Sequence, residues 1–222
     1  MHRTIKSFVL RTGRVSNRQQ QALDQLLPFY ELPLDDIPWD LNAIFGREAK
    51  TVVEIGFGMG SSLLTTAKQQ PEINFIGIEV HRAGIGSLVA DLRDEGLSNV
   101  RIVPADAVSV FKKQLADNSL AGVQIFFPDP WHKKRHNKRR LIQPEFIQLI
   151  VRRLATGGIL HCATDWQDYA EHIQAVLTAE PALTNTQADG GYSPRPETRP
   201  LTKFEQRGQR LGHGVRDLIY FK

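Results

Sequence analysis

The sequence has almost no cysteine: Cys162 is the only one in 222 residues. A single thiol cannot form a disulfide within the chain, which excludes a fold held together by disulfides. Cys162 lies in the apolar run 158–163, where a buried strand residue is far more common than a nucleophile. No catalytic thiol is therefore predicted.

Long apolar runs are also missing. No stretch approaches the ~20 consecutive apolar residues of a membrane-spanning helix. Near the N-terminus only residues 8–10 form an apolar run, whereas the core of a signal peptide needs about 7 to 15 such residues. Internal repeats and low-complexity tracts are lacking as well. We therefore expect a cytoplasmic protein with one domain and short appendages.

Acidic residues are missing from two stretches, residues 1–23 and 131–140. These stretches hold 11 of the 28 lysines and arginines, which leaves 17 basic residues against 24 acidic ones elsewhere. The rest of the chain is thus net acidic, although the whole chain carries +4. One basic run is equally typical of a solvated face, but two such runs on an acidic body favour a polyanionic partner such as a nucleic acid.

From residue 51 onward the chain alternates short apolar runs with helical patterns. This alternation predicts an α/β fold in which crossover helices join the parallel strands of a doubly wound sheet. The predicted parallel strands cover residues 52–55, 74–80, 100–103, 122–127 and 158–163. Helices are predicted over 83–95 and 144–154, a final strand over 218–221, and a long loop over 184–200, which is rich in glycine and proline.

The first 40 residues are predicted to lie outside the main domain, which we expect to cover residues 41–222. They begin with a basic arm. A short helix follows, and Ser16 and Gln19 have the spacing of a capping box at its start. Three prolines, at positions 28, 33 and 38, then indicate a linker.

A glycine-rich turn, with Gly56, Gly58 and Gly60 preceded by Glu54, follows the first predicted strand. Glycines let a backbone bend tightly and approach a ligand closely. A dinucleotide-binding turn has the spacing G-x-G-x-x-G, but Ser61 stands where its third glycine belongs, and Glu54 would repel a pyrophosphate. The turn therefore argues against a nicotinamide-dependent oxidoreductase. It favours S-adenosylmethionine, which has an amino group, a cationic sulfonium and no phosphate.

Two further acids, Glu79 and Asp106, follow the next two predicted strands. Ligands of doubly wound sheets bind at the carboxyl ends of the strands. Glu79 is therefore expected to accept hydrogen bonds from the ribose hydroxyls of the cofactor, and Asp106 from its adenine amino group. The alternative is that either acid caps a helix or is merely solvated, but their order along successive strands favours the cofactor role.

The fourth predicted strand runs directly into Pro128-Asp129-Pro130-Trp131. Because Asp129 precedes a proline, its backbone is pushed toward an extended conformation. The two prolines also stiffen the loop, so we expect a fixed carboxylate that faces the transferable methyl group. An aspartate that only shapes a turn is the alternative.

Basic residues follow this aspartate at once, with six lysines and arginines within residues 132–140. They would bind phosphate groups, with an affinity that falls as salt rises. Trp131 is expected either to stack on a base or to pack within the protein. His132 and His136 have i, i+4 spacing, but no nearby carboxylate or cysteine completes a ligand set, so no metal site is predicted.

Over residues 51–220 the chain resembles the bacterial tRNA (guanine-N7-)-methyltransferase family. The matching segments are residues 54–60, 77–81, 128–140, 164–166, 202–205, 207–208 and 211–214. Arg216 departs from the pattern, because an aromatic residue is expected there. The resemblance implies a Rossmann-like methyltransferase fold with a mostly parallel seven-stranded sheet, an antiparallel C-terminal strand and helices on both faces. It also implies S-adenosylmethionine as cofactor and methylation of N7 of a variable-loop guanosine in tRNA.

The same resemblance implies roles for individual residues. Asp129 is the implied catalytic residue. The implied cofactor contacts are Glu54, Glu79, Asp106 and Asp129, to which the turn adds Gly56, Gly58 and Gly60. The implied substrate contacts are Lys133, Asp165, Thr202, Lys203, Phe204 and Glu205, and the implied RNA-binding stretch is Arg135, His136, Asn137, Lys138, Arg139 and Arg140.

Methylation at N7 of guanine needs placement rather than a general base, because N7 has an in-plane lone pair and no proton. Asp129 is expected to position the base and to favour the positive charge that moves onto the purine. Asp165 and Glu205 are candidate acceptors for the N1–H and N2–H groups of guanine, with helix capping as the alternative, for Asp165 especially. Methylation of another RNA or another guanine atom, and a non-catalytic RNA-binding protein, stay open as alternatives.

Overall fold

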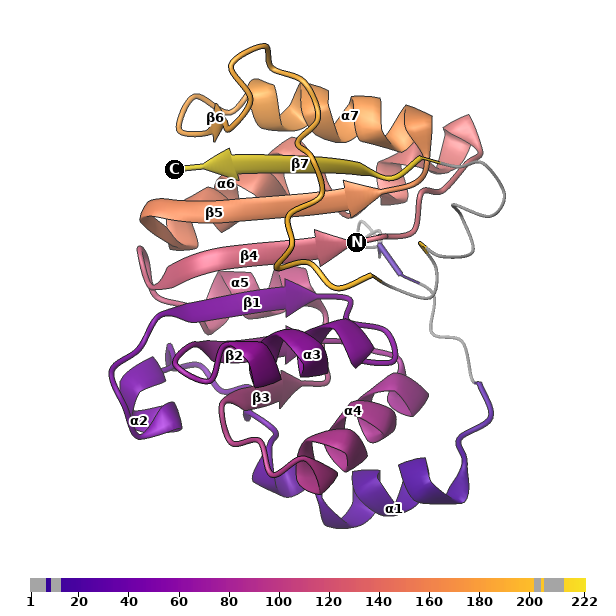
Figure 1. Cartoon of the computed structure of the whole chain (residues 1–222), viewed down its shortest axis with the longest axis vertical. Helices are drawn as coiled ribbons and strands as arrows, with labels where there is room; N and C mark the ends of the chain where they lie inside the picture. Colours follow the sequence, from indigo (N-terminus) through magenta and orange to yellow (C-terminus); the bar gives the residue numbers. More distant parts are fainter. Residues whose placement is uncertain (1–6, 9–12, 202–204, 206–213) are drawn as a thin grey trace.

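A seven-stranded sheet forms the centre of the computed structural model, which describes residues 7–8, 13–201, 205 and 214–222. The strand order is β3-β2-β1-β4-β5-β7-β6 (Figure 1). Strands β1 to β5 pair in parallel, and β7 is antiparallel to both β5 and β6. The strands are β1 (Thr51–Ile55), β2 (Asn74–Ile78), β3 (Val100–Val103), β4 (Leu120–Phe126), β5 (Leu154–Thr164), β6 (Thr184–Asn185) and β7 (Arg216–Phe221). The predicted doubly wound α/β fold is confirmed.

Among the strands, β5 and β6 differ most from the prediction. β5 starts at Leu154 instead of residue 158, because its first residue pairs with Leu120 of β4 across a register shift that precedes Gly122. The preceding helix accordingly ends at Arg153. β6 is only two residues long and lies inside the predicted loop, where no alternation of apolar residues marks it.

Helices cover both faces of the sheet (Figure 1). One core contains Leu63, Phe75 and Leu88, which join α3 and α4 to the sheet, and the other contains Phe111 and Ile147 of α5 and α6. Burial on both faces explains why β2 is apolar without alternation. The described helices are α1 (Asn17–Gln25), η1 (Leu27–Phe29), α2 (Leu41–Phe45), α3 (Ser61–Gln69), α4 (Arg82–Asp94), α5 (Ala107–Lys113), η2 (Lys134–Arg139), α6 (Pro144–Arg153) and α7 (Gln167–Thr178).

The predicted N-terminal helix and linker pack against this body. α1 starts at the predicted capping box, in which the side chain of Ser16 accepts from the Gln19 amide and that of Gln19 accepts from the Ser16 amide. It lies along α4, where Gly86 permits close approach, since a Cβ there would lie 2.6 Å from the Gln19 carbonyl oxygen. Residues 30–32 then pair with Ile102 of β3.

The loop predicted over 184–200 crosses the sheet in front of β7, β5 and β4 (Figure 1). The Ser193 amide donates to the Asp217 carbonyl oxygen at 2.8 Å, which ties the loop to β7. Pro196 and Thr198 line a cavity together with residues of β4 and β5. The loop thereby carries Arg199 to the carboxyl end of β4, where its side chain is buried.

Candidate active site

A cavity of about 230 Å³ opens at the carboxyl ends of the parallel strands. Three of the four predicted strand-end acids, Glu79, Asp106 and Asp129, line this single cavity. The fourth, Glu54, lies buried next to the wall residues Ile55 and Gly56. The other lining residues are Ser7, Phe8, Ile78, Val80, Ala105, Ala107, Phe126, Phe127, Pro128 and Leu141.

The glycine turn after β1 needs its glycines. Gly56, Gly58 and Gly60 have φ angles of 77°, 58° and 83°, in the left-handed region that residues with a Cβ rarely adopt. The Gly58 amide donates to Glu79 Oε2 at 2.9 Å. The helix that follows β2 also comes very close, since a Cβ on Gly84 would lie 1.9 Å from the Gly58 carbonyl oxygen.

Glu79 ties the turns after β1 and β2 together. Its Oε2 accepts from the Gly58 amide, and its Oε1 accepts from the amides of Val80 and His81 at 2.6 and 3.0 Å. These bonds fix the carboxylate while leaving lone pairs that face the cavity. The arrangement suits the predicted contact with ribose hydroxyls.

Glu54 is 3% exposed, and its Oε2 has no hydrogen-bond partner. Burial, and secondly the charge of Glu79, raises the pKa of Glu54 to about 8. A buried carboxylate oxygen without a partner is costly unless a ligand supplies a donor or a positive charge. The amino group and sulfonium of S-adenosylmethionine would supply both, so the residues present fit this cofactor.

Asp106 has two roles at once. Its Oδ1 accepts from the Val108 amide at 3.3 Å, which caps α5, and the residue also lines the cavity. The helix-capping alternative and the placement expected for a cofactor contact therefore coexist. A capping bond uses one oxygen and leaves the other for the ligand.

Asp129 lies on a strained turn. Phe127 and Trp131, on either side of it, have φ angles of 51° and 45°, which are rare for bulky residues. The Phe127 amide donates to the Ala163 carbonyl oxygen at 2.8 Å, which anchors the turn to β5. Backbone strain of this kind is concentrated at functional sites, and here it surrounds the predicted catalytic carboxylate.

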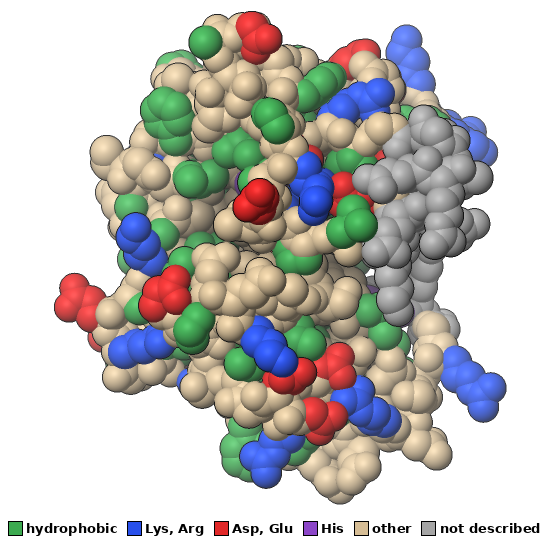
Figure 2. Space-filling view, in the orientation of Figure 1, with side chains coloured by type: hydrophobic (Ala, Val, Ile, Leu, Met, Phe, Trp, Pro, Cys, Tyr) green, Lys and Arg blue, Asp and Glu red, His purple; other side chains and the backbone are tan. Residues whose placement is uncertain are grey.

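The basic stretch that follows forms the 3-10 helix η2. Lys133, Lys134, Arg135 and Lys138 are exposed, as phosphate binding requires, while His136, Asn137 and Arg139 are half-buried. Desolvation and the neighbouring cations lower the pKa of His136, so a neutral imidazole is favoured. Acidic and basic side chains are interspersed on the face shown in Figure 2. In sequence, by contrast, residues 131–140 contain basic residues and no acidic ones.

Trp131 packs within the protein. The guanidinium carbon of Arg139 lies 3.9 Å from its ring centre, and its Nε1 donates to the Ser7 carbonyl oxygen at 3.1 Å. The packing alternative therefore describes Trp131 in this structure. These contacts also bring Ser7 and Phe8 from the N-terminal arm to the mouth of the cavity.

Arg140 differs from the other predicted RNA-binding residues. It is 3% exposed, pairs with Asp168, donates from Nε to the Pro130 carbonyl oxygen at 2.9 Å and lies over the Tyr169 ring. Its guanidinium is thus turned inward, where it supports the Asp129 turn, and the predicted RNA contact does not fit this placement. Nothing in the sequence distinguishes Arg140 as the buried residue among these six lysines and arginines.

The predicted substrate contacts are only partly brought together. Asp165 lies outside the cofactor cavity and lines a neighbouring open cavity of about 400 Å³ with Trp166. The start of α7 has no side-chain cap, so the capping alternative for Asp165 is wrong. The ring of His132 packs on Trp166 with centroids 4.1 Å apart, which joins this region to the basic stretch. Thr202, Lys203 and Phe204 lie outside the described residues.

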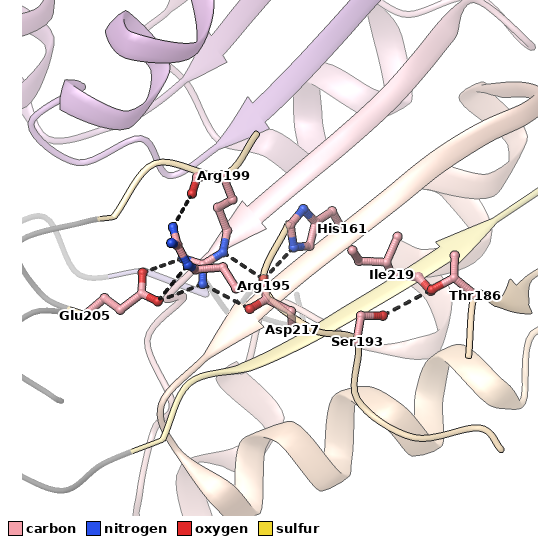
Figure 3. A network of polar contacts seen from close by, with 8 residues as sticks. All are labelled: His161, Thr186, Ser193, Arg195, Arg199, Glu205, Asp217 and Ile219. Carbon is pink, nitrogen blue, oxygen red and sulfur yellow. Dashed lines mark hydrogen bonds and ion pairs between the residues drawn. The ribbon is translucent and has the colours of Figure 1, made fainter. Parts of the chain in front are cut away.

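Glu205 is buried, and both its oxygens accept from Arg199 at 2.7 and 2.9 Å (Figure 3). A direct contact with guanine, as predicted, does not fit a carboxylate engaged in this way. Arg199 also contacts Asp217, and Asp217 contacts His161, so Glu205 belongs to a buried polar cluster. These three residues were not predicted from the sequence as part of the site. Only the Pro-rich setting of Arg199 distinguishes it from other arginines, so no local signal identifies the cluster.

No group of three or more histidine, cysteine, aspartate or glutamate side chains has the arrangement of a metal site in the parts of the chain that the structure describes. Within those same parts, no helix combines the length and the apolar character needed to cross a bilayer.

Comparison with known proteins places this chain in a family. Residues 48–218 match the family model described as "Putative methyltransferase". A tRNA (guanine-N(7)-)-methyltransferase of Legionella pneumophila (strain Corby) is 63% identical, with 100% of both chains covered. One of Pseudomonas entomophila (strain L48) is 54% identical and covers 100% of this chain and 92% of its own.

Solved structures support the fold alone, because their sequence identity is low. The antibiotic-resistance methyltransferase Kmr has a TM-score of 0.54 at 16% identity and covers 86% of this chain and 97% of its own. An rRNA methylase from Streptococcus thermophilus has a TM-score of 0.52 at 13% identity, with 95% and 99% covered. The family model over residues 48–218 and the full-length relatives establish that this chain belongs to the tRNA (guanine-N(7)-)-methyltransferase family.

Proposed function

We propose that this protein transfers a methyl group from S-adenosylmethionine to N7 of a variable-loop guanosine in tRNA. The observation that carries the proposal is the single cavity in which strand-end carboxylates meet the strained Asp129 turn, directly before an exposed basic helix. The names of relatives that are 54 to 63% identical over the full chain support the same substrate.

The residues of the chain divide the binding task. Glu79 is fixed by three backbone amides and would hold the ribose hydroxyls of S-adenosylmethionine, while Asp106 would accept from its adenine amino group. The unpartnered oxygen of Glu54 would be stabilised by the positive charge of the cofactor. When bound, S-adenosylmethionine supplies a methyl group on a cationic sulfonium.

Asp129 positions the target guanine and favours the positive charge that develops on it, because a carboxylate fixed in advance stabilises a nearby cation without reorganisation. No general base is required, since N7 carries no proton. Alignment of the nucleophile and the methyl group then dominates the rate. The Phe127 to Trp131 turn and the inward-facing Arg140 hold Asp129 for that purpose.

The exposed cations of η2 bind the tRNA backbone. Lys134, Arg135 and Lys138 point away from the core and attract phosphates without reading sequence. Asp165 does not cap α7 and is the candidate acceptor for the guanine N1–H and N2–H groups.

We further propose that residues 41–222 form the catalytic domain and that residues 1–40 are appended to it. We also propose that the enzyme works in the cytoplasm.

Methyl transfer from labelled S-adenosylmethionine to unmodified tRNA, followed by strand scission at N7-methylguanosine, tests the function. We expect label in tRNA and one cut, at a variable-loop guanosine. Labelled tRNA without scission would indicate another atom or nucleotide, and the absence of label in any tRNA would contradict the proposal and favour a non-catalytic RNA-binding protein.

A further inference from the structure

A buried arginine, Arg199, lies at the centre of the polar cluster in Figure 3. Its side chain is 1% exposed and donates to both oxygens of Glu205 at 2.7 and 2.9 Å. On its other side it contacts Asp217, at 2.7 Å from Nε and 3.0 Å from Nη2. Asp217 is in turn 2.7 Å from His161 Nε2. A planar guanidinium held between two carboxylates has little freedom to rotate.

The carboxyl group of Asp217 in this cluster is ionised. Burial alone would raise the pKa of Asp217, but hydrogen bonds from His161 and Arg199 hold that pKa below its ordinary value. The same pairing with Glu205 and Asp217 keeps the pKa of Arg199 above its ordinary value despite burial. Ion pairs of Arg199 with Glu205 and Asp217 therefore hold the geometry of the cluster.

The guanidinium of Arg199 also faces the end of β4. Its central carbon lies 5.9 Å from the ring centre of Phe126 and 5.8 Å from that of Phe127, within the range of a cation–π contact. Phe127 is the residue with the left-handed φ of 51°, and such a conformation persists only when the surroundings hold it. Asp129 follows two residues later, in the wall of the cofactor cavity.

We infer that Arg199 is a positioning residue for methyl transfer, which holds Phe127 in its left-handed conformation and thereby keeps Asp129 at the cofactor cavity. The inference rests on the proposed function and assigns a role to a residue outside every predicted site. Without the guanidinium, Phe127 relaxes toward negative φ and Asp129 moves. A displacement of about 1 Å at a reacting centre can cost about 100-fold in rate.

Glu205 then acts through Arg199 and does not read the guanine edge. Both its oxygens are engaged and it is 2% exposed. The side chain of Arg199 thus joins the loop over 191–201 and Glu205 to the Asp129 turn. These segments are far from β4 in the sequence.

Arg199→Lys tests the inference, because lysine keeps the charge but cannot bind both carboxylates as a fork. Arg153→Lys is the matched control. Arg153 is also buried, pairs with Asp117 and donates to the Phe111 carbonyl oxygen at 2.9 Å, at the opposite end of β4 from the site. For wild type and both variants, kcat, the Kd for S-adenosylmethionine and the hydrogen exchange rate of the Phe127 amide are measured.

In Arg199→Lys we expect kcat to fall about 100-fold, the Kd for S-adenosylmethionine to stay close to wild type and the Phe127 amide to exchange faster. Arg153→Lys should leave kcat and Phe127 exchange unchanged. Phe127→Leu, which removes the ring and leaves the ion pairs, should reproduce the loss of kcat if Arg199→Lys fails to fold.

Wild-type kcat in a folded Arg199→Lys or Phe127→Leu variant would overturn the inference. Unchanged exchange at Phe127 in Arg199→Lys would overturn it too, and this readout does not need activity. An inactive wild-type enzyme would instead contradict the proposed function, so the two failures are distinguishable.

Discussion

At the scale of single residues, we predict that Glu54, whose Oε2 has no hydrogen-bond partner, makes cofactor binding depend on pH. Burial and the nearby Glu79 raise its pKa to about 8, so it holds a proton at neutral pH. A cationic cofactor favours the ionised form, and binding therefore releases a proton. The affinity for S-adenosylmethionine should rise with pH, by up to about tenfold per unit below that pKa, as titration calorimetry in two buffers would measure.

Glu54→Gln, which cannot ionise, is the control for this effect. In the wild type, Glu54 of the unfolded chain ionises around its ordinary pKa of 4.5, whereas Glu54 of the folded chain ionises only near pH 8. The free energy of unfolding therefore falls as the pH rises from about 4.5 to about 8. The glutamine variant should lack both this fall and the proton release. The same pH dependence of affinity in Glu54→Gln would contradict the role of Glu54.

Site residues that lie at the ends of parallel strands could be predicted from the sequence. Residues whose position depends on long-range packing could not. Glu79, Asp106 and Asp129 line one cavity because parallel strands end at one edge of the sheet. The pairing of Arg199 with Glu205 depends instead on how a loop crosses the sheet. Nothing local distinguishes it from solvated charges.

At the scale of elements, η2 should carry the electrostatic part of tRNA binding. Replacing Lys134 and Lys138 together with glutamine should weaken tRNA binding and lower the slope of log affinity against log salt by about 2, since each phosphate contact contributes about one unit. Arg140→Gln should leave the slope unchanged and lower the free energy of unfolding by roughly 2 kcal/mol, because its buried hydrogen bonds are lost. A titration of binding over a range of salt concentrations measures the slope, and an equal change in Arg140→Gln would contradict the division of roles.

The close contact between α4 and the glycine turn predicts that a side chain at Gly84 disturbs the cofactor site. Alanine normally stabilises a helix relative to glycine, but a Cβ on Gly84 would lie 1.9 Å from the Gly58 carbonyl oxygen and must displace the turn. Such overpacking costs about 1 to 3 kcal/mol, so Gly84→Ala should weaken S-adenosylmethionine binding by about tenfold or more.

Gly122→Ala serves as the matched control, since its Cβ would lie 3.4 Å from the Ile159 carbonyl oxygen, an ordinary contact. Equilibrium binding of the cofactor to both variants decides the matter. Equal affinities would show that the turn after β1 does not depend on this close approach.

At the scale of the whole molecule, the order of the parallel strands β1 to β5 along the chain could be predicted, because a local pattern marks each of them. The strand ends then bring the cofactor residues together without further information. The rest of the site comes from three segments whose positions depend on tertiary packing: Ser7 and Phe8 at the cavity mouth, Arg140 turned inward and the loop over 191–201. Their apolar and ionic contacts join residues far apart in the chain, which no local pattern encodes.

In the proposed mechanism, Asp129 is held at the carboxyl edge of the sheet, where methyl transfer takes place. Single-turnover methyl transfer to unmodified tRNA by wild type and Asp129→Ala, with binding of tRNA and S-adenosylmethionine measured in parallel, tests this role. In Asp129→Ala we expect a rate lower by about 100-fold or more while tRNA binding survives. A variant that methylates N7 at nearly the wild-type rate would contradict it.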